Sequence, residues 1–269
     1  MRLVGAVAIV SSLTFQSLAA QSAAGSASGA AGAVSRGIAA FERRDPATAL
    51  HEFEEALQAD STNYEANWRA ALALINLGME TPDGVKSPER DSLYARAERY
   101  GRRAVRSDRA GADGYFILAN ALGRTALTKS KSERIRLAGE IRDASLRAIE
   151  LDPSHDGAYH VLGRWNAEIM RLSGLSRFFA KSFLGARVFN QASWDDAIAN
   201  LERAVQLDPK RIFHRLDLAA VYVDRKRYGS ARAQLDTLET LPIRDYLDPR
   251  YKEQAAALLQ KIADKKDNS

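Results

Sequence analysis

Hydrophobic and polar residues over most of this chain alternate with the period of amphipathic helices, and one helical pattern recurs along it. Residues 144–153 have the sequence ASLRAIELDP, and residues 200–209 have the similar sequence NLERAVQLDP. Residues 49–63, with the sequence ALHEFEEALQADSTN, end in a comparable way. The recurrence of one helical pattern at intervals of a few tens of residues is typical of helical-repeat proteins.

Small residues within these segments indicate where neighbouring helices approach each other closely. Large residues such as Phe53 and Leu201 fill the space beside them. We expect the tight contacts at Ala49, Ala56, Ala148, Ala197 and Ala204. The Asp-Pro pairs that begin at Asp152 and Asp208 predict that one helix ends and the next begins there, because proline is tolerated in the first turn of a helix but not in its interior.

A second pattern of large and small residues follows each turn and marks the first helix of the next pair. It occupies residues 67–71, 115–119, 159–163 and 215–219. A final segment, residues 245–265, contains Asp248 as a helix cap and Pro249 in the first turn, which predicts a capping helix. We therefore predict an all-α, tetratricopeptide-like, right-handed solenoid of about four helix pairs, with insertions inside the repeats and a C-terminal capping helix.

These segments in series resemble tetratricopeptide repeats over nearly all of residues 35–241. The C-terminal half is also similar to the regulator of microtubule dynamics family. That similarity lies in YHVLGRW at residues 159–165, WDDA at residues 194–197, the pair Leu241-Pro242, Lys252 and the pair Leu258-Leu259. The resemblance implies a tetratricopeptide-like fold and protein binding, and it brings no catalytic motif with it.

The turns that end successive repeats lie 48, 44 and 56 residues apart, whereas a simple repeat of this type spans about 34. The excess predicts insertions at residues 78–89, 128–133 and 169–194. The third contains phenylalanine, arginine and lysine but no acidic residue. Two interpretations stay open: its aromatic residues pack on the repeats, which the interruption of a continuous helix by glycine favours, or it docks on a partner or an anionic membrane surface.

The N-terminus has the pattern of a secretory signal, with one arginine, a short apolar run and small residues before Gln21. We predict a signal peptide over residues 1–20, cleaved after Ala19 or Ala20, and a periplasmic or secreted location; an uncleaved anchor is the alternative. Residues 21–34, rich in Gly, Ala and Ser, are expected to form a flexible leader. The repeat domain then covers residues 35–264, and residues 265–269 form a disordered tail.

Composition removes several classes of chemistry. The chain has no cysteine, which excludes disulfides, thiol catalysis and cysteine zinc sites. Its net charge of +5 is spread along the sequence and does not indicate a nucleic-acid surface. No phosphate-binding, dinucleotide or hydrolase motif occurs, and His155 and His160 beside acidic residues are only a weak candidate for a metal site. We predict a protein that is not an enzyme and needs no cofactor or metal.

The concave groove of the solenoid is the predicted binding surface, for a protein or peptide with apolar anchors. The first helices supply its candidate contact residues: Trp68, Leu72, Asn76, Phe116, Asn120, His160, Arg164 and Asp224. Together they offer large apolar surface and hydrogen-bonding groups, as a peptide site needs. A peripheral membrane protein that uses residues 169–194, and an enzyme with an unrecognised site, are the alternatives. The oligomeric state stays open.

Overall fold

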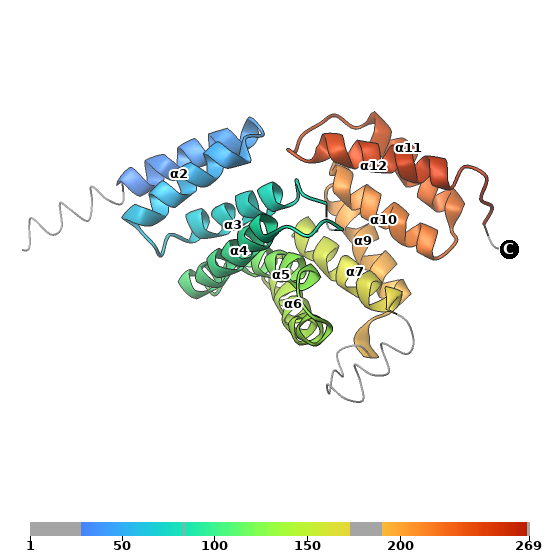
Figure 1. Ribbon diagram of the computed structural model, residues 1–269, viewed down its shortest axis with the longest axis horizontal. Coiled ribbons are helices and arrows are strands. Elements are labelled where there is room, and N and C mark those ends of the chain that lie inside the picture. Colours follow the sequence, from blue (N-terminus) through green and yellow to red (C-terminus); the bar gives the residue numbers. More distant parts are fainter. Residues whose placement is uncertain (1–27, 83, 173–189, 268–269) are drawn as a thin grey trace, which may run out of the picture.

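The computed structural model describes residues 28–82, 84–172 and 190–267, and within these ranges the regular elements are helices without any strand (Figure 1). A first helix spans residues 28–42. The others are α2 (Pro46–Ala59), α3 (Tyr64–Gly78), α4 (Pro88–Ser107), α5 (Ala112–Leu127), α6 (Lys131–Leu151), α7 (Asp156–Arg171), α9 (Trp194–Leu207), α10 (Ile212–Asp224), α11 (Tyr228–Thr240) and α12 (Asp248–Lys261).

Short polar side chains begin many of these helices by accepting a hydrogen bond from a backbone N–H of the first turn. Asp45, Asn63, Ser87, Ser130 and Ser193 cap α2, α3, α4, α6 and α9 in this way.

The prediction that Pro153 and Pro209 start helices is wrong. Both prolines lie in the turn between helices, because the preceding aspartate ends one helix and its carboxylate accepts a backbone N–H two residues later.

The helices form antiparallel pairs that stack in sequence order. The second helix of each pair packs on the first, and the first helices also contact one another, α3 with α5, α5 with α7, α7 with α10 and α10 with α12. This contact pattern confirms the predicted all-α solenoid. The structure describes five pairs rather than about four, since the helix at residues 28–42 pairs with α2, and α12 packs on α10 and α11 as the predicted cap.

The N-terminal helix corrects the predicted leader. Residues 28–34 were expected to be flexible, yet they belong to this helix, and Ala30, Ala33 and Val34 are buried in the core that contains Phe53. Their small side chains allow the helix to approach α2 closely, so a composition typical of a linker here serves packing. The predicted signal peptide and residues 21–27 lie outside the described residues. At the other end, Asp267 of the predicted tail accepts a hydrogen bond from the backbone N–H of Gly229.

The alanines predicted at tight helix contacts are all buried without any exposed surface, as are Phe53 and Leu201. We expect Ala148→Leu and Ala204→Leu each to lower the free energy of unfolding by about 1–3 kcal/mol, the usual cost of inserting methylenes into a packed core. Thermal unfolding followed by circular dichroism measures the effect. Melting temperatures equal to that of the unmodified chain would show that these positions are not close contacts.

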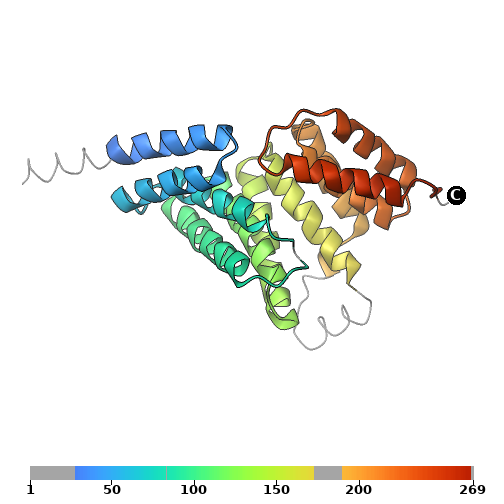
Figure 2. The same cartoon turned by 45° about the horizontal axis from the view of Figure 1, so that its top comes forward.

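Contacts between distant parts of the chain close the solenoid on one side. The Tyr246 hydroxyl donates a hydrogen bond of 2.6 Å to the Glu80 carboxylate, and the Arg250 guanidinium donates to the Met79 carbonyl oxygen. Figure 2 shows that α12 begins on the side that faces the N-terminal helices. The insertion after α3 therefore meets the segment that leads into the capping helix.

Most of the third predicted insertion, residues 173–189, lies outside the described residues, so neither interpretation of it is tested. None of the helices that the structure describes is both long and apolar enough to cross a bilayer.

Candidate binding groove

The first helices of the pairs surround a cavity of about 1130 Å³ on the concave side of the solenoid. α3, α5, α7, α10 and α12 all contribute to its walls, and so does α6. Aromatic and aliphatic side chains make up much of the lining, among them Phe41, Trp68, Phe116, Trp165, Phe213 and Tyr251. A cavity of this size, mostly apolar with a few polar groups, is typical of a binding site.

Seven of the eight predicted contact residues line this cavity, namely Trp68, Leu72, Asn76, Phe116, Asn120, His160 and Arg164. Asp224 is not part of the lining. It is the last residue of α10, and its carboxylate accepts hydrogen bonds of 2.9 and 2.6 Å from the Arg171 guanidinium, which ties the ends of α7 and α10 together. The structure therefore assigns Asp224 to an ion pair between helices rather than to the groove.

Two asparagines on the cavity wall differ from the asparagines of the core. Buried Asn67 and Asn166 donate their amide hydrogens to backbone carbonyl oxygens and so hold the turns of their helices. Asn76 and Asn120 are only partly buried, and within the described residues neither side chain has a hydrogen-bond partner. Each therefore presents to the groove a donor and an acceptor that no other described side chain or backbone group uses.

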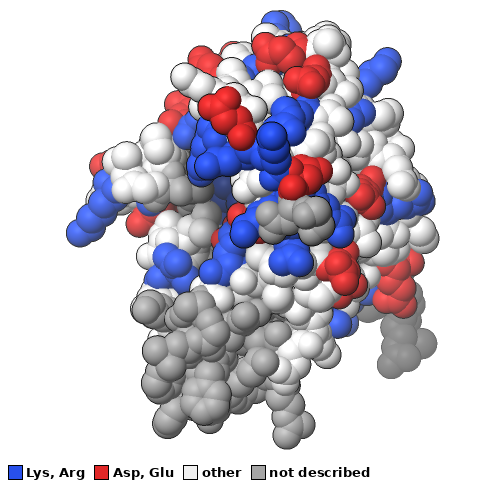
Figure 3. Space-filling view, turned by 90° about the vertical axis from the view of Figure 1, so that its right-hand side faces the viewer, with Lys and Arg blue, Asp and Glu red and all other residues white. Residues whose placement is uncertain are grey.

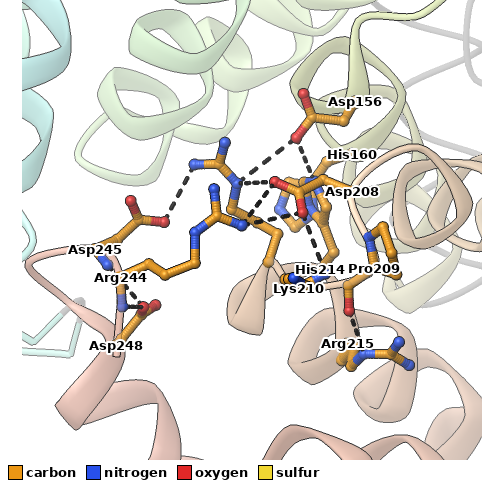
Figure 4. A network of polar contacts seen from close by, with 11 residues as sticks. Asp156, His160, Asp208, Pro209, Lys210, His214, Arg215, Arg244, Asp245 and Asp248 are labelled. Carbon is orange, nitrogen blue, oxygen red and sulfur yellow. Dashed lines mark hydrogen bonds and ion pairs between the residues drawn. The ribbon is translucent and has the colours of Figure 1, made fainter. Parts of the chain in front are cut away.

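A row of charged and imidazole groups crosses the contact between α7 and α10 (Figure 4). His214 Nε2 lies 2.7 Å from Asp156 Oδ2, and its Nδ1 lies 3.0 Å from His160 Nδ1. At the other end, His160 Nε2 lies 3.1 Å from Asp217 Oδ2. Both imidazoles are buried, His214 completely and His160 with 7% of its surface exposed. We call these four residues the histidine array.

The three contacts of the histidine array need three hydrogen atoms, one in each. Two neutral imidazoles carry only two N–H groups, and an ionised carboxylate carries none. One of the three contacts therefore has no hydrogen atom between its two atoms unless the pair of imidazoles carries a positive charge. The array satisfies all three contacts only after it has taken up one further proton.

Burial opposes the uptake of that further proton. It lowers the pKa of His160 to about 4, although the neighbouring Asp217 carboxylate acts to raise it. Burial also lowers the pKa of His214, against the effect of Asp156. Burial alone would raise the pKa of Asp156, but the hydrogen bond from His214 and the nearby Arg211 bring it down to about 2. At neutral pH the carboxylates are thus ionised and the imidazoles are neutral.

Arg211 connects this row to the segment that closes the solenoid. Its guanidinium lies 3.7 Å from the Asp156 carboxylate, 3.1 Å from Asp208 and 3.1 Å from Asp245. Asp245 directly precedes Tyr246, whose hydroxyl reaches the insertion after α3. The charges at the groove are therefore held in place by elements from three parts of the chain.

On the face that Figure 3 shows, acidic and basic side chains are interspersed. Among the described residues, no three histidine or acidic side chains gather as they would around a metal ion. His214 and Asp217 were missed by the sequence analysis. The sequence contained one signal for the histidine array, because His160 and His214 lie on the first helices of two consecutive pairs, α7 and α10.

Comparison with known proteins agrees with this architecture. The family described as "Regulator of microtubule dynamics protein 1-3" matches residues 38–263. The chain belongs to this family. Regulator of microtubule dynamics protein 1 of Caenorhabditis elegans is 24% identical over 221 residues, which cover 82% of this chain and 95% of the relative. The bovine protein of the same name is 23% identical over 207 residues, 77% of this chain and 64% of that protein.

Solved structures support the fold of this family member. A thermophilic TPR protein of Thermus thermophilus superimposes with a TM-score of 0.61, at 19% identity, over 86% of this chain and 99% of that one. The pilF protein of Pseudomonas aeruginosa gives a TM-score of 0.52, at 15% identity, over 88% and 93% of the two chains. The predicted tetratricopeptide-like fold and the resemblance to the regulator family are both confirmed.

Proposed function

We propose that this member of the regulator of microtubule dynamics family is a scaffold that binds an extended segment of a partner protein in its groove. The helical-repeat fold serves protein interaction in general, since stacked pairs present a concave surface. The observation that carries the finer proposal is the pair of amides, Asn76 and Asn120, which lack hydrogen-bond partners within the described residues on the wall of an apolar cavity.

An amide side chain complements a peptide bond, because it can accept from a backbone N–H and donate to a backbone C=O. Trp68 and Phe116 lie on the same wall and provide apolar surface for side chains of the bound segment. Both rings are partly exposed, with the Arg69 guanidinium 4.3 Å from the Trp68 ring centroid and the His155 ring 4.7 Å from that of Phe116. Main-chain recognition by the amides and side-chain recognition by the rings together fit a peptide. Catalysis has no comparable support.

The first test begins with affinity capture, in which residues 21–269 serve as bait in an extract of the source cells. We expect Asn76→Ala and Asn120→Ala each to weaken binding of a captured partner about fivefold, the usual value of one hydrogen bond. Neither change should lower the melting temperature, because neither amide bonds to the rest of the described chain.

Asn200→Ala is the matched control. Its amide donates to the Asp196 carbonyl oxygen within α9, and it does not line the cavity. Its affinity should equal that of the unmodified chain. Undiminished binding by a variant that lacks both groove amides would remove the groove as the binding surface and direct attention to residues 169–194.

We also propose that the chain is exported, on the strength of the signal pattern in residues 1–20. Export would place the groove in the periplasm or outside the cell. The mature chain should begin at Ala20 or Gln21, which mass spectrometry of the N-terminal peptide can establish. A mature chain that retains Met1 or Arg2 would contradict cleavage.

A further inference from the structure

The histidine array lies at the wall of the groove and faces charged groups from several elements. His160 lines the cavity directly, whereas His214 lies behind it and is completely buried. Asp156 and Arg164 come from α7, and Asp217 comes from α10. The groups contributed by α5, the residue before α7, α12 and the segments before α10 and α12 are Arg124, His155, Tyr251, Asp208, Arg211 and Asp245.

The cavity lining is balanced in formal charge, because five arginines and five carboxylates line it. They are Arg124, Arg134, Arg164, Arg211 and Arg250, and Asp113, Asp156, Glu168, Asp217 and Asp245. Asp156 and Asp217 already contact the imidazoles, and Asp217 also lies 3.4 Å from the Arg164 guanidinium. A further proton on the array would add one positive charge beneath this surface. Such a charge is costly beside a partly apolar cavity because it leaves the lining with a net positive charge, and a carboxylate placed in the groove would balance it.

We propose that the His160–His214 pair is a proton-binding site of the groove, and that a segment with an acidic side chain binds there together with one proton. The proposal rests on the binding of a protein segment in the groove. The incoming carboxylate interacts with Arg164 and raises the proton affinity of the array. The added proton completes the three short contacts between α7 and α10, so the same event strengthens the helix contact beneath the ligand.

Linkage fixes the direction of the effect. A ligand that raises the proton affinity of a site must itself bind more tightly as the proton concentration rises. With one proton taken up, affinity increases by at most about tenfold for each unit of decreasing pH. A cationic ligand at the same place lowers the proton affinity, and its binding weakens over the same range.

The test uses three fluorescein-labelled octapeptides in which leucine alternates with glutamate, glutamine or lysine. Their affinities are measured by fluorescence anisotropy between about pH 8 and about pH 5.5, a range in which free glutamate, with a pKa of about 4.3, stays ionised. We expect binding of the glutamate peptide to tighten at least about tenfold over this range. Binding of the glutamine peptide should stay constant, and that of the lysine peptide should weaken.

Variants assign the proton to the array. His160→Gln and His214→Gln each keep an uncharged donor and acceptor but cannot titrate, and each should abolish the pH dependence for the glutamate peptide. His51→Gln makes the same change at an exposed residue of α2 and should leave the pH dependence of binding unchanged. If the array variants do not fold, NMR titration of the imidazoles in the unmodified chain tests the proposal instead. The glutamate peptide should raise the pKa of His160, and a pKa of His160 that does not rise when the peptide binds overturns the proposal.

The outcomes separate this inference from the proposed function. Binding of all three peptides with equal pH dependence would leave the groove as a peptide site and overturn the proton linkage. A pH dependence that persists in both array variants would do the same. Failure of every peptide to bind at any pH would remove the proposed function and, with it, this inference.

Discussion

We expect Gly163→Leu to lower the free energy of unfolding by about 3 kcal/mol, at the upper end of the usual cost of overpacking. Gly163 lies in α7 where α9 crosses it. A Cβ atom there would lie 2.7 Å from Leu201 Cγ, 3.1 Å from the Ala197 carbonyl oxygen and 3.1 Å from the Leu201 backbone nitrogen. Two of these atoms belong to the backbone and cannot rotate away, so α7 and α9 must separate.

Gly123→Leu is the matched control, because Gly123 also lies within a first helix but no atom comes within 4 Å of its Cβ position. Leucine favours helix over glycine by a little under about 1 kcal/mol, so this variant should be as stable as the unmodified chain or slightly more stable. Urea denaturation compares the two. Equal midpoints for both variants would show that the contact between α7 and α9 is looser than described.

The second large effect is a loss of stability on acidification without ligand. A histidine whose pKa is lowered by folding stays neutral in the native chain while the unfolded chain takes up the proton. With a pKa of about 4 for His160 in place of the ordinary 6.5, the free energy of unfolding should fall by about 2 kcal/mol between about pH 7 and about pH 5. His214, whose pKa is also lowered, acts in the same direction.

The acidic partners do not cancel this loss. The pKa of Asp156 lies at about 2 and that of Asp217 is also lowered. Both carboxylates are therefore largely ionised in the native and unfolded chains throughout this pH range. His160→Gln should reduce the pH dependence of the urea midpoint, and His51→Gln should not. A midpoint that is constant between the two pH values would contradict the burial of neutral imidazoles.

Local patterns in the sequence predicted the solenoid because its contacts are mostly local. The alanines at helix contacts and the first-helix positions of the groove follow from one repeat pattern, and the structure buries or exposes them accordingly. The N-terminal helix escaped prediction, since Gly, Ala and Ser at residues 28–32 are as common in linkers as in closely packed helices. Packing on α2 decides between the two, and no local pattern reports it.

The histidine array could not be predicted for a different reason. His160 and His214 are separated by 54 positions, and a partly undescribed insertion lies between their helices. Their contact depends on how α7 and α10 are placed, which the repeat pattern fixes only approximately. Asp224 shows the same limit, because Asp217 lines the groove whereas Asp224, about two turns further along α10, pairs with Arg171.

The contacts of Tyr246 with Glu80 and of Arg250 with Met79 restrict how this protein can evolve. An open solenoid can gain or lose a repeat by duplication or deletion, since each new pair only extends the stack. In this protein, an added helix pair between α4 and α11 would place α12 beyond the insertion after α3. A deleted pair would leave α12 too far away to contact that insertion. Repeat number is thus a fixed property of the closed form, and variation between relatives should accumulate in loops and chain ends instead.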